Sequence, residues 1–336
     1  MNGILKTSMV LLGLALFAAC SNDSDEQTTQ QPPQPKSYPL TIEVTENPLV
    51  QDGEPASSRS NRAAITTTST LTEFKLNYAY NTTCSTEDPV TASKETEGKW
   101  TSSGNWPEIS GDNWKDVVVT WYAKTGGTLN YDGSNPYISF STDEQSNKQH
   151  DLLVATAADT WNNSKGKLSF TFNHVCSALR LSVKKATNIS DYTLTVSNIV
   201  LMNVVKVGNY YYNTSSWTLS SEANNRSNYT LYSASGMTLG SSSTDYVSLN
   251  GNFGTNEEPY LFLIPQTLTA WNASTNTTGA YISLTCTITK DATTVYNGEA
   301  RIPFTKELLK GKSYDVKINI GKNSLLKTDG TKIIND

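Results

Sequence analysis

The stretch LSFTF at residues 168–172 alternates large apolar side chains with hydroxyl side chains, and ALRLSV at residues 178–183 repeats the alternation. A period of two residues is the period of a β-strand with one buried face. Similar segments follow on both sides at the spacing of a β-sandwich. We expect strands at 70–80, 117–123, 137–141 and 152–155 before this pair, and at 193–207, 229–232, 260–264, 281–288 and 314–320 after it. The chain is therefore predicted to be all-β, with a short helix only around 305–309.

Composition supports this fold class and suggests two domains. Tyr, Thr, Ser, Asn and Val are abundant, only 17% of residues are charged, and long runs of strong helix formers are absent, as in extracellular all-β proteins. A chain of 336 residues exceeds one ordinary domain. The polar break at 159–166 places the predicted boundary, giving domains at 38–160 and 161–336. The net charge of −5 argues against a nucleic-acid partner.

The N-terminus has the pattern of a secretory signal peptide. Lys6 precedes an apolar run at residues 9–17, and small residues precede Cys20. This run is shorter than the roughly 20 residues that a membrane-spanning helix needs. Residues 1–19 are therefore predicted to be removed, and the Pro-, Gln- and Thr-rich residues 20–37 to form a disordered tether.

The end of this signal resembles the bacterial lipobox, in which the cysteine thiol is acylated, for instance with palmitate. This resemblance makes Cys20 the predicted lipidation site. The acidic residues that follow, 21–26, are similar to the export tag of surface lipoproteins in the Bacteroidetes. The alternatives are an ordinary signal peptide cut nearby and a solvated linker.

A first, isolated strand is predicted in YPLTIEV, residues 38–44, where Leu40, Ile42 and Val44 supply one apolar face. The following segment, residues 47–64, is rich in Pro, Gly, Ser and Asn and has no periodicity. It carries Arg59 and Arg62 near its end. We expect this segment to be exposed and accessible to proteases.

No motif in the sequence predicts an enzyme. Gly-x-Ser-x-Gly, His-Glu-x-x-His and Gly-rich phosphate loops are missing, and His150 and His174 are the only histidines. His174 is expected to be a structural residue, hydrogen-bonded at a strand end. The acidic pairs 143–144 and 257–258 are interpreted as solvated charge rather than as a glycosidase pair. We therefore predict no catalytic residue, no cofactor and no metal site.

Three cysteines remain once Cys20 is assigned to lipidation: Cys84, Cys176 and Cys286. An odd set allows at most one disulfide. Cys176 and Cys286 both fall within strand patterns, which favours small buried hydrophobic side chains over a bridge. Whether any two of the three pair is left open.

The seven tryptophans raise a glycan-stacking hypothesis, because flat aromatic faces bind sugar rings. Trp121 lies within a strand pattern and is predicted to be core. Trp100, Trp106 and Trp114 lie in a polar segment, where exposure is more plausible. Covering one end of a sandwich remains their favoured role.

Five features in succession resemble the fimbrillin-family pilin precursors of the Bacteroidetes, of the FimA-like and Mfa-like kind. They are the acylable Cys20, the strand YPLTIEV, the arginine-bearing SSRSNRAA before TTTSTLTEFKLNYAY, the junction HDLLVATAADTWNNSKGKLSFTFNHVCSALRLSV, and YLFLIPQTL with the late GKSYDVKINIG. The resemblance implies two tandem transthyretin-like β-sandwich domains and a lipoprotein precursor at the outer membrane.

The resemblance also implies assembly by strand exchange. A protease cuts after an arginine, for which Arg62 is the first choice and Arg59 the second, and residues 38–62 form the pro-segment. Removal of the strand that carries Leu40, Ile42 and Val44 would open a groove for another subunit's strand.

We therefore expect a structural and adhesive subunit of a cell-surface fimbria. Its partners would be other pilin subunits, identical or different, and a host protein or glycan receptor. The alternative is a surface glycan-binding lipoprotein. The candidate donor tail, residues 324–334, has its apolar residues interrupted by Lys327, Asp329 and Gly330, which tilts the prediction towards an accessory or tip-like subunit. Position in the fimbria, receptor and processing protease cannot be read from the sequence.

Overall fold

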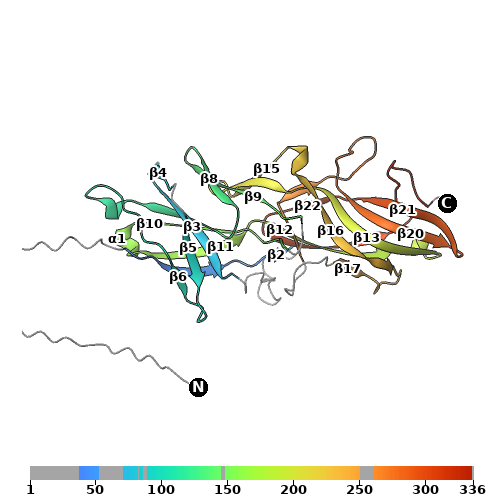
Figure 1. The fold of residues 1–336 in the computed structure, drawn as a ribbon, viewed down its shortest axis with the longest axis horizontal. Coiled ribbons are helices and arrows are strands. Elements are labelled where there is room, and N and C mark those ends of the chain that lie inside the picture. Colours follow the sequence, from blue (N-terminus) through green and yellow to red (C-terminus); the bar gives the residue numbers. More distant parts are fainter. Residues whose placement is uncertain are drawn as a thin grey trace, which may run out of the picture. The chain divides into compact units, whose positions relative to one another are not determined.

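The computed structural model describes residues 38–52, 71–81, 83–85, 89–144, 148–249 and 260–334. In these ranges the chain is built almost entirely from β-strands, so the predicted all-β fold class is confirmed (Figure 1). By its internal contacts, the chain from Tyr38 to Asp336 forms one compact unit. The predicted signal peptide, tether and lipidation site Cys20 lie outside the described residues, as do Arg59 and Arg62.

The largest sheet contains the predicted first strand in its interior. Its order is β4 (Thr83–Cys84), β3 (Glu73–Tyr80), β5 (Val90–Lys94), β6 (Trp100–Ser102), β1 (Thr41–Glu46), β11 (Lys167–His174), β10 (Leu153–Asp159) and β7 (Val119–Lys124). Because β3 also pairs with β7, the pairings form a closed ring from β1 through β11, β10, β7, β3, β5 and β6 back to β1. Alternate side chains of β11 point into the core that this sheet encloses, which includes Phe74, Phe170 and Phe172.

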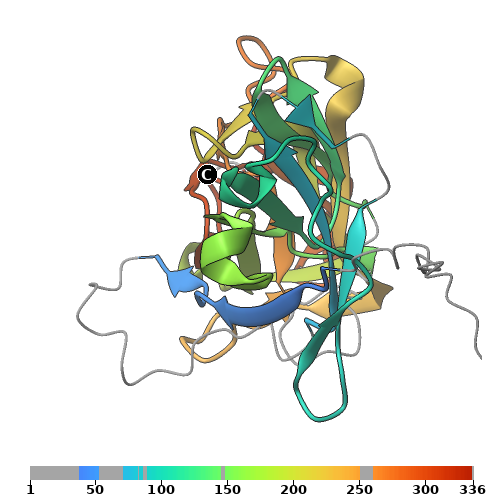
Figure 2. The same ribbon diagram turned by 90° about the vertical axis from the view of Figure 1, so that its left-hand side faces the viewer.

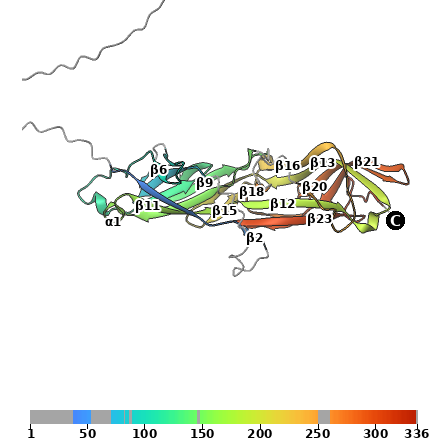
Figure 3. The ribbon, with the colours of Figure 1, turned by 90° about the horizontal axis from the view of Figure 1, so that it is seen from below.

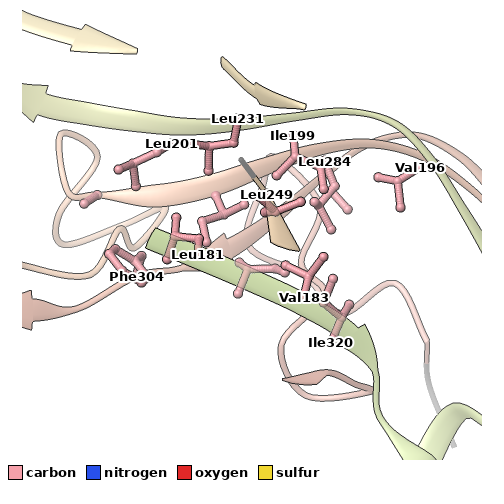
Figure 4. Packing of buried hydrophobic residues seen from close by; sticks show 14 of the residues in the cluster. Leu181, Val183, Val196, Ile199, Leu201, Leu231, Leu249, Leu284, Phe304 and Ile320 are labelled. Carbon is pink, nitrogen blue, oxygen red and sulfur yellow. The ribbon is translucent and has the colours of Figure 1, made fainter. Parts of the chain in front are cut away.

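Two further sheets enclose a second core. The first has the order β17 (Val247–Leu249), β12 (Ser177–Lys185), β23 (Lys312–Ile320) and β2 (Val50–Gln51), and β18 (Leu261–Leu263) also pairs with β12. The second has the order β16 (Arg226–Thr238), β13 (Tyr192–Val205), β20 (Tyr281–Lys290) and β21 (Thr293–Pro303). Figure 4 shows Leu181 and Val183 of β12 in the same core as Ile199 of β13 and Leu284 of β20. These residues pack as the two inner faces of a sandwich.

A third core cluster lies where strands from both halves of the chain meet. The sheet β15 (Ser216–Leu219), β14 (Val207–Tyr211), β9 (Asn135–Ser141), β8 (Thr128–Asp132) contributes Ile138 and Tyr210 to this cluster, and β18 contributes Phe262. The predicted domain boundary after residue 160 falls between β10 and β11, which pair with each other. The division into two domains therefore stays a prediction, and the described chain is continuous across it in sheet and core.

Every range predicted as a strand contains one, but the helix predicted at 305–309 is wrong. That segment holds β22 (Lys306–Leu308), which pairs with β19 (Gln266–Leu268). Pairing with a distant strand overrides a weak local helix preference. The helix α1 (Trp161–Ser164) lies instead in the polar break, where the Thr160 hydroxyl accepts a hydrogen bond from the Asn163 backbone N–H. The described 3₁₀ helices include η2 (Trp114–Asp116), η4 (Thr187–Ile189) and η5 (Ala223–Asn225).

The cysteine interpretation is confirmed. Cys84, Cys176 and Cys286 are all free, and the last two are buried among apolar side chains. Burial raises the pKa of the Cys286 thiol to about 12, so this thiol stays protonated at neutral pH. None of the helices within the described ranges has the length and apolar character needed to cross a lipid bilayer.

Candidate functional site: the N-terminal segment, residues 38–52

The first strand, β1, is held on both sides by backbone pairing. It runs parallel to β11 along its whole length, from Thr41 opposite Lys167 to Glu46 opposite Phe172. On its other side it pairs with β6 at Ile42 opposite Trp100. Figure 2 shows β1 in blue, passing close to α1. Removing β1 would leave unpaired backbone groups on both β6 and β11.

The inward face of β1 carries the residues predicted from the alternation. Leu40 and Ile42 are buried, with 7% and 5% of their surface exposed, and Val44 is half-buried against the same core. Full burial of an aliphatic side chain of this size stabilises a fold by about 1.5–3 kcal/mol. The predicted strand and its apolar face are therefore present. The removal of this strand stays a prediction.

Tyr38 anchors the start of the N-terminal segment in an aromatic cluster. Its ring centre lies 4.9 Å from that of Trp114 and 5.0 Å from that of Trp161, both edge to face. The Trp106 backbone N–H donates to the Tyr38 carbonyl at 2.7 Å. Trp106 itself is only 1% exposed, and its ring packs on Trp121, which is core as predicted. With the segment in place, Trp106 offers no face to a sugar ring.

The end of the segment reaches the second group of sheets. Leu49 is buried in the third core cluster, and β2 pairs in parallel with the start of β23. The Asp52 backbone N–H donates to the Ser313 carbonyl at 2.8 Å, and Lys306 Nζ lies 3.1 Å from Asp52 Oδ2. Figure 3 shows the blue segment beside β11 and then β2 beside β23. A segment of 15 residues thus contacts strands of two different sheets.

A buried ionic cluster lies where β1 ends. His174 Nδ1 is hydrogen-bonded to Asp151 Oδ2, and His174 Nε2 lies 3.1 Å from Glu46 Oε1. The latter contact has the distance of an ion pair but not the geometry of a hydrogen bond. The exposed fractions of the side chains are 1% for His174, 5% for Asp151 and 16% for Glu46.

The surroundings of His174 favour its charged form. Burial by itself disfavours the imidazolium, but the hydrogen bond to Asp151 and the negative charges of Asp151 and Glu46 outweigh it and raise the pKa of His174 to about 9. His174 therefore carries a positive charge at neutral pH. Its predicted place as a hydrogen-bonded residue at a strand end is confirmed, because it is the last residue of β11. No sequence pattern indicates its partner Glu46, apart from the inward position that this residue has on β1.

The remaining candidate residues do not form a chemical site. Within the described ranges, no group of three or more His, Cys, Asp and Glu side chains could hold a metal ion. Glu144, from one of the acidic pairs, forms an exposed ion pair with Lys206, and hydrogen bonds from Lys206 and Ser227 lower the pKa of its carboxyl. The pair 257–258 lies outside the described residues.

The candidate donor tail packs on its own chain. Leu325 and Ile334 are buried in the second core, at 0% and 3% exposed. Leu326 exchanges two backbone hydrogen bonds with Arg301 of β21, at 2.8 and 3.0 Å. In this state, therefore, the tail is part of the subunit's own sandwich.

Comparison with known proteins identifies the family. The sequence model of fimbrillin-like proteins matches residues 60–335. The chain belongs to the fimbrillin-like family. The N-terminal segment lies before the matched range, and the sheets described above lie mostly within it. As a member of this family, the fimbrillin-like protein is a fimbrial component of the cell surface.

Solved structures of similar proteins include a fimbrial protein from Bacteroides vulgatus, with 16% identity, a TM-score of 0.48, and coverage of 84% of this chain and 96% of that one. Another is a protein assigned to cell adhesion from Bacteroides ovatus, with 15% identity, a TM-score of 0.47, and coverage of 86% of this chain and 95% of that one. A search of the curated proteins finds no match.

Proposed function

We propose that this fimbrillin-like protein is a precursor subunit of a surface fimbria, in which the N-terminal segment is a temporary strand. The segment holds the position between β6 and β11 until it is cut off. A strand of a neighbouring subunit then takes that position. Anchoring of the precursor at the outer membrane through a lipid on Cys20, and cutting after Arg62 or Arg59, are parts of the same proposal.

One observation carries the proposal: β1 is a member of a closed ring of paired strands, with a neighbour on each side, and it is also the first strand of the compact unit. Because β1 comes first in the compact unit, a single cut in the chain after it allows it to leave without breaking any other covalent bond. Its loss would leave two unpaired strand edges beside an apolar core, which is the arrangement that recruits an added strand.

The buried tail supports an accessory or tip-like position. A shaft subunit must both accept and donate a strand, whereas here residues 324–334 contribute Leu325 and Ile334 to the subunit's own core. Releasing them would cost about 2–5 kcal/mol for each large side chain removed from a core. We therefore propose a subunit that accepts a strand more readily than it donates one.

Cutting the purified precursor with an arginine-specific protease tests the proposal. We expect a fragment that begins near Ala63, loss of residues 38–62 under mild denaturant, and an emptied strand position that takes up an added peptide of residues 38–52, followed by size-exclusion chromatography and fluorescence anisotropy. The double variant Arg59→Gln, Arg62→Gln is the matched control and should remain uncut and monomeric. A cut chain that releases the segment but takes up no added strand would contradict the assembly proposal.

A further inference from the structure

The side chains that line the position of β1 are apolar except for one charged side chain, His174. Along the inward face of the segment, Leu40, Ile42 and Val44 contact the core, and Glu46, two residues further along, contacts His174. Glu43, by contrast, points outward and forms an exposed ion pair with Lys167 at 2.7 Å. The two carboxylates of one strand thus have very different surroundings.

His174 belongs to the part of the protein that remains after the N-terminal segment leaves. His174 ends β11, and its Nδ1 is already bound to Asp151, in the segment before β10. The Cys176 thiol lies beside Asp151 and, because burial raises its pKa well above the ordinary value, adds no charge. The other ring nitrogen of His174, Nε2, is therefore available to contact the strand that lies beside β11. In the precursor this contact is made by the carboxylate of Glu46.

We infer that His174, held by Asp151, selects the strand that replaces β1: the incoming strand carries a carboxylate at the position of Glu46, after apolar residues at the positions of Leu40, Ile42 and Val44. An apolar or cationic side chain there would bury the imidazolium N–H without an acceptor, or beside a like charge. The selection also fixes register, because a shift of one residue turns the carboxylate to the outer face. This inference rests on the proposed strand replacement and names its partner.

The same rule excludes the tail of a second copy of this chain. The acidic residues near its end are Asp329 and Asp336. Placing Asp329 at the Glu46 position puts Lys327 at the Val44 position, and placing Asp336 there puts Lys332 at the Ile42 position. Either lysine would have to enter the apolar core. For a strand that runs in the direction of β1, we therefore expect the donor to be a different subunit, with the pattern apolar-x-apolar-x-apolar-x-acid.

Peptide binding tests the inference with a matched control. The full chain is cut and freed of its own segment, and fluorescent peptides of residues 38–52 are titrated in by anisotropy. Glu46→Gln is expected to weaken binding by about 3- to 10-fold and Glu46→Lys by more than about 30-fold, because charge-assisted contacts are roughly twice as strong as neutral ones. Glu43→Gln and Glu43→Lys should stay within about 2-fold, since their ion pair is exposed.

Three further results decide the assignment to His174. In the His174→Gln chain, the preference for Glu over Gln at position 46 should fall to within about 2-fold, and in the original chain it should fall between pH 7 and pH 10 as the imidazolium loses its proton. A peptide of residues 322–336 should not compete. A preference that persists in His174→Gln, or a tail peptide that competes equally, overturns the inference.

The uncut chain separates this inference from the assembly proposal. Hydrogen exchange of the β1 backbone should be faster in Glu46→Gln than in Glu43→Gln, whether or not cut subunits associate. Equal exchange in the two variants overturns the selection by His174. A cut chain that takes up no added strand contradicts only the proposed assembly.

Discussion

The N-terminal segment and the C-terminal tail both contribute apolar side chains to a core, but they do so with different backbones. Residues 41–46 are fully extended and paired in regular register with β11. The tail, residues 322–334, makes only isolated bridges, Leu326 with Arg301 and Leu326 with Lys332, around a turn at 327–331. A regular ladder can be rebuilt by another strand with the same alternation and a carboxylate at the position of Glu46, whereas the tail has no such ladder to rebuild. This difference is why we assign replacement to the first region and not to the second.

The largest effect is expected for a charge on the inward face of β1. Ile42→Asp places an unpaired carboxylate in the core and should lower the free energy of unfolding of the precursor by about 4 kcal/mol. Urea unfolding measures the loss. Thr41→Asp, on the outward face of the same strand, is the control and should change the value by less than about 0.5 kcal/mol. Equal losses in both variants would mean that the inward face is not buried in solution.

A cavity under the tail should cause the next largest loss of stability, and it should raise hydrogen exchange in different strands. Leu325→Ala removes a fully buried side chain and should cost about 3 kcal/mol of unfolding free energy. Hydrogen exchange should rise in β20 and β21 and remain unchanged in β1, because Leu325 packs in the second core and β1 in the first. Loss of protection in β1 would show that the two regions unfold together despite packing in separate cores.

The ionic cluster should make stability depend on pH. The folded pKa of His174, about 9, is above its ordinary value of 6.5, so its stabilisation is complete below pH 6.5 and is lost as the pH rises through 9. The full effect of such a shift is on the order of 3 kcal/mol. Chemical unfolding at pH 6, 8 and 10 should therefore show a decline in the original chain that is reduced in His174→Gln. Parallel declines in both chains would assign the pH dependence to other groups.

The smallest effect is expected at the far end of the N-terminal segment. Asp52→Asn removes a partly exposed ion pair with Lys306 and should cost less than about 0.5 kcal/mol. A thermal unfolding series from low to high salt checks this, since the original chain should lose the same small amount as salt screens the pair. A cost above 1 kcal/mol would make this end, rather than the apolar face, the main anchor of the segment.

Much of the site could be predicted because its strands are local patterns. The alternation of Leu40, Ile42 and Val44 identifies a strand with one buried face. The isolation of that strand before a polar, arginine-bearing segment is the basis for predicting that it is removable, which stays a prediction. The polar segment that holds Trp106 misled in part, because its sequence context made exposure plausible, whereas the Trp106 ring is buried against Trp121 and Trp161. A polar neighbourhood in sequence does not report which side chains fold inward.

By itself, the sequence determined the strands, their inward faces and the all-β class, because these follow from the two-residue period of side chains along an extended backbone. Only the tertiary structure decided which strands meet. It placed Glu46 beside His174, Tyr38 between Trp114 and Trp161, and Asp52 beside Lys306, pairs that are separated by long stretches of chain. A strand's pattern states that one face must be covered, but many partners satisfy that requirement equally well. The choice among them depends on packing and charge over the whole fold.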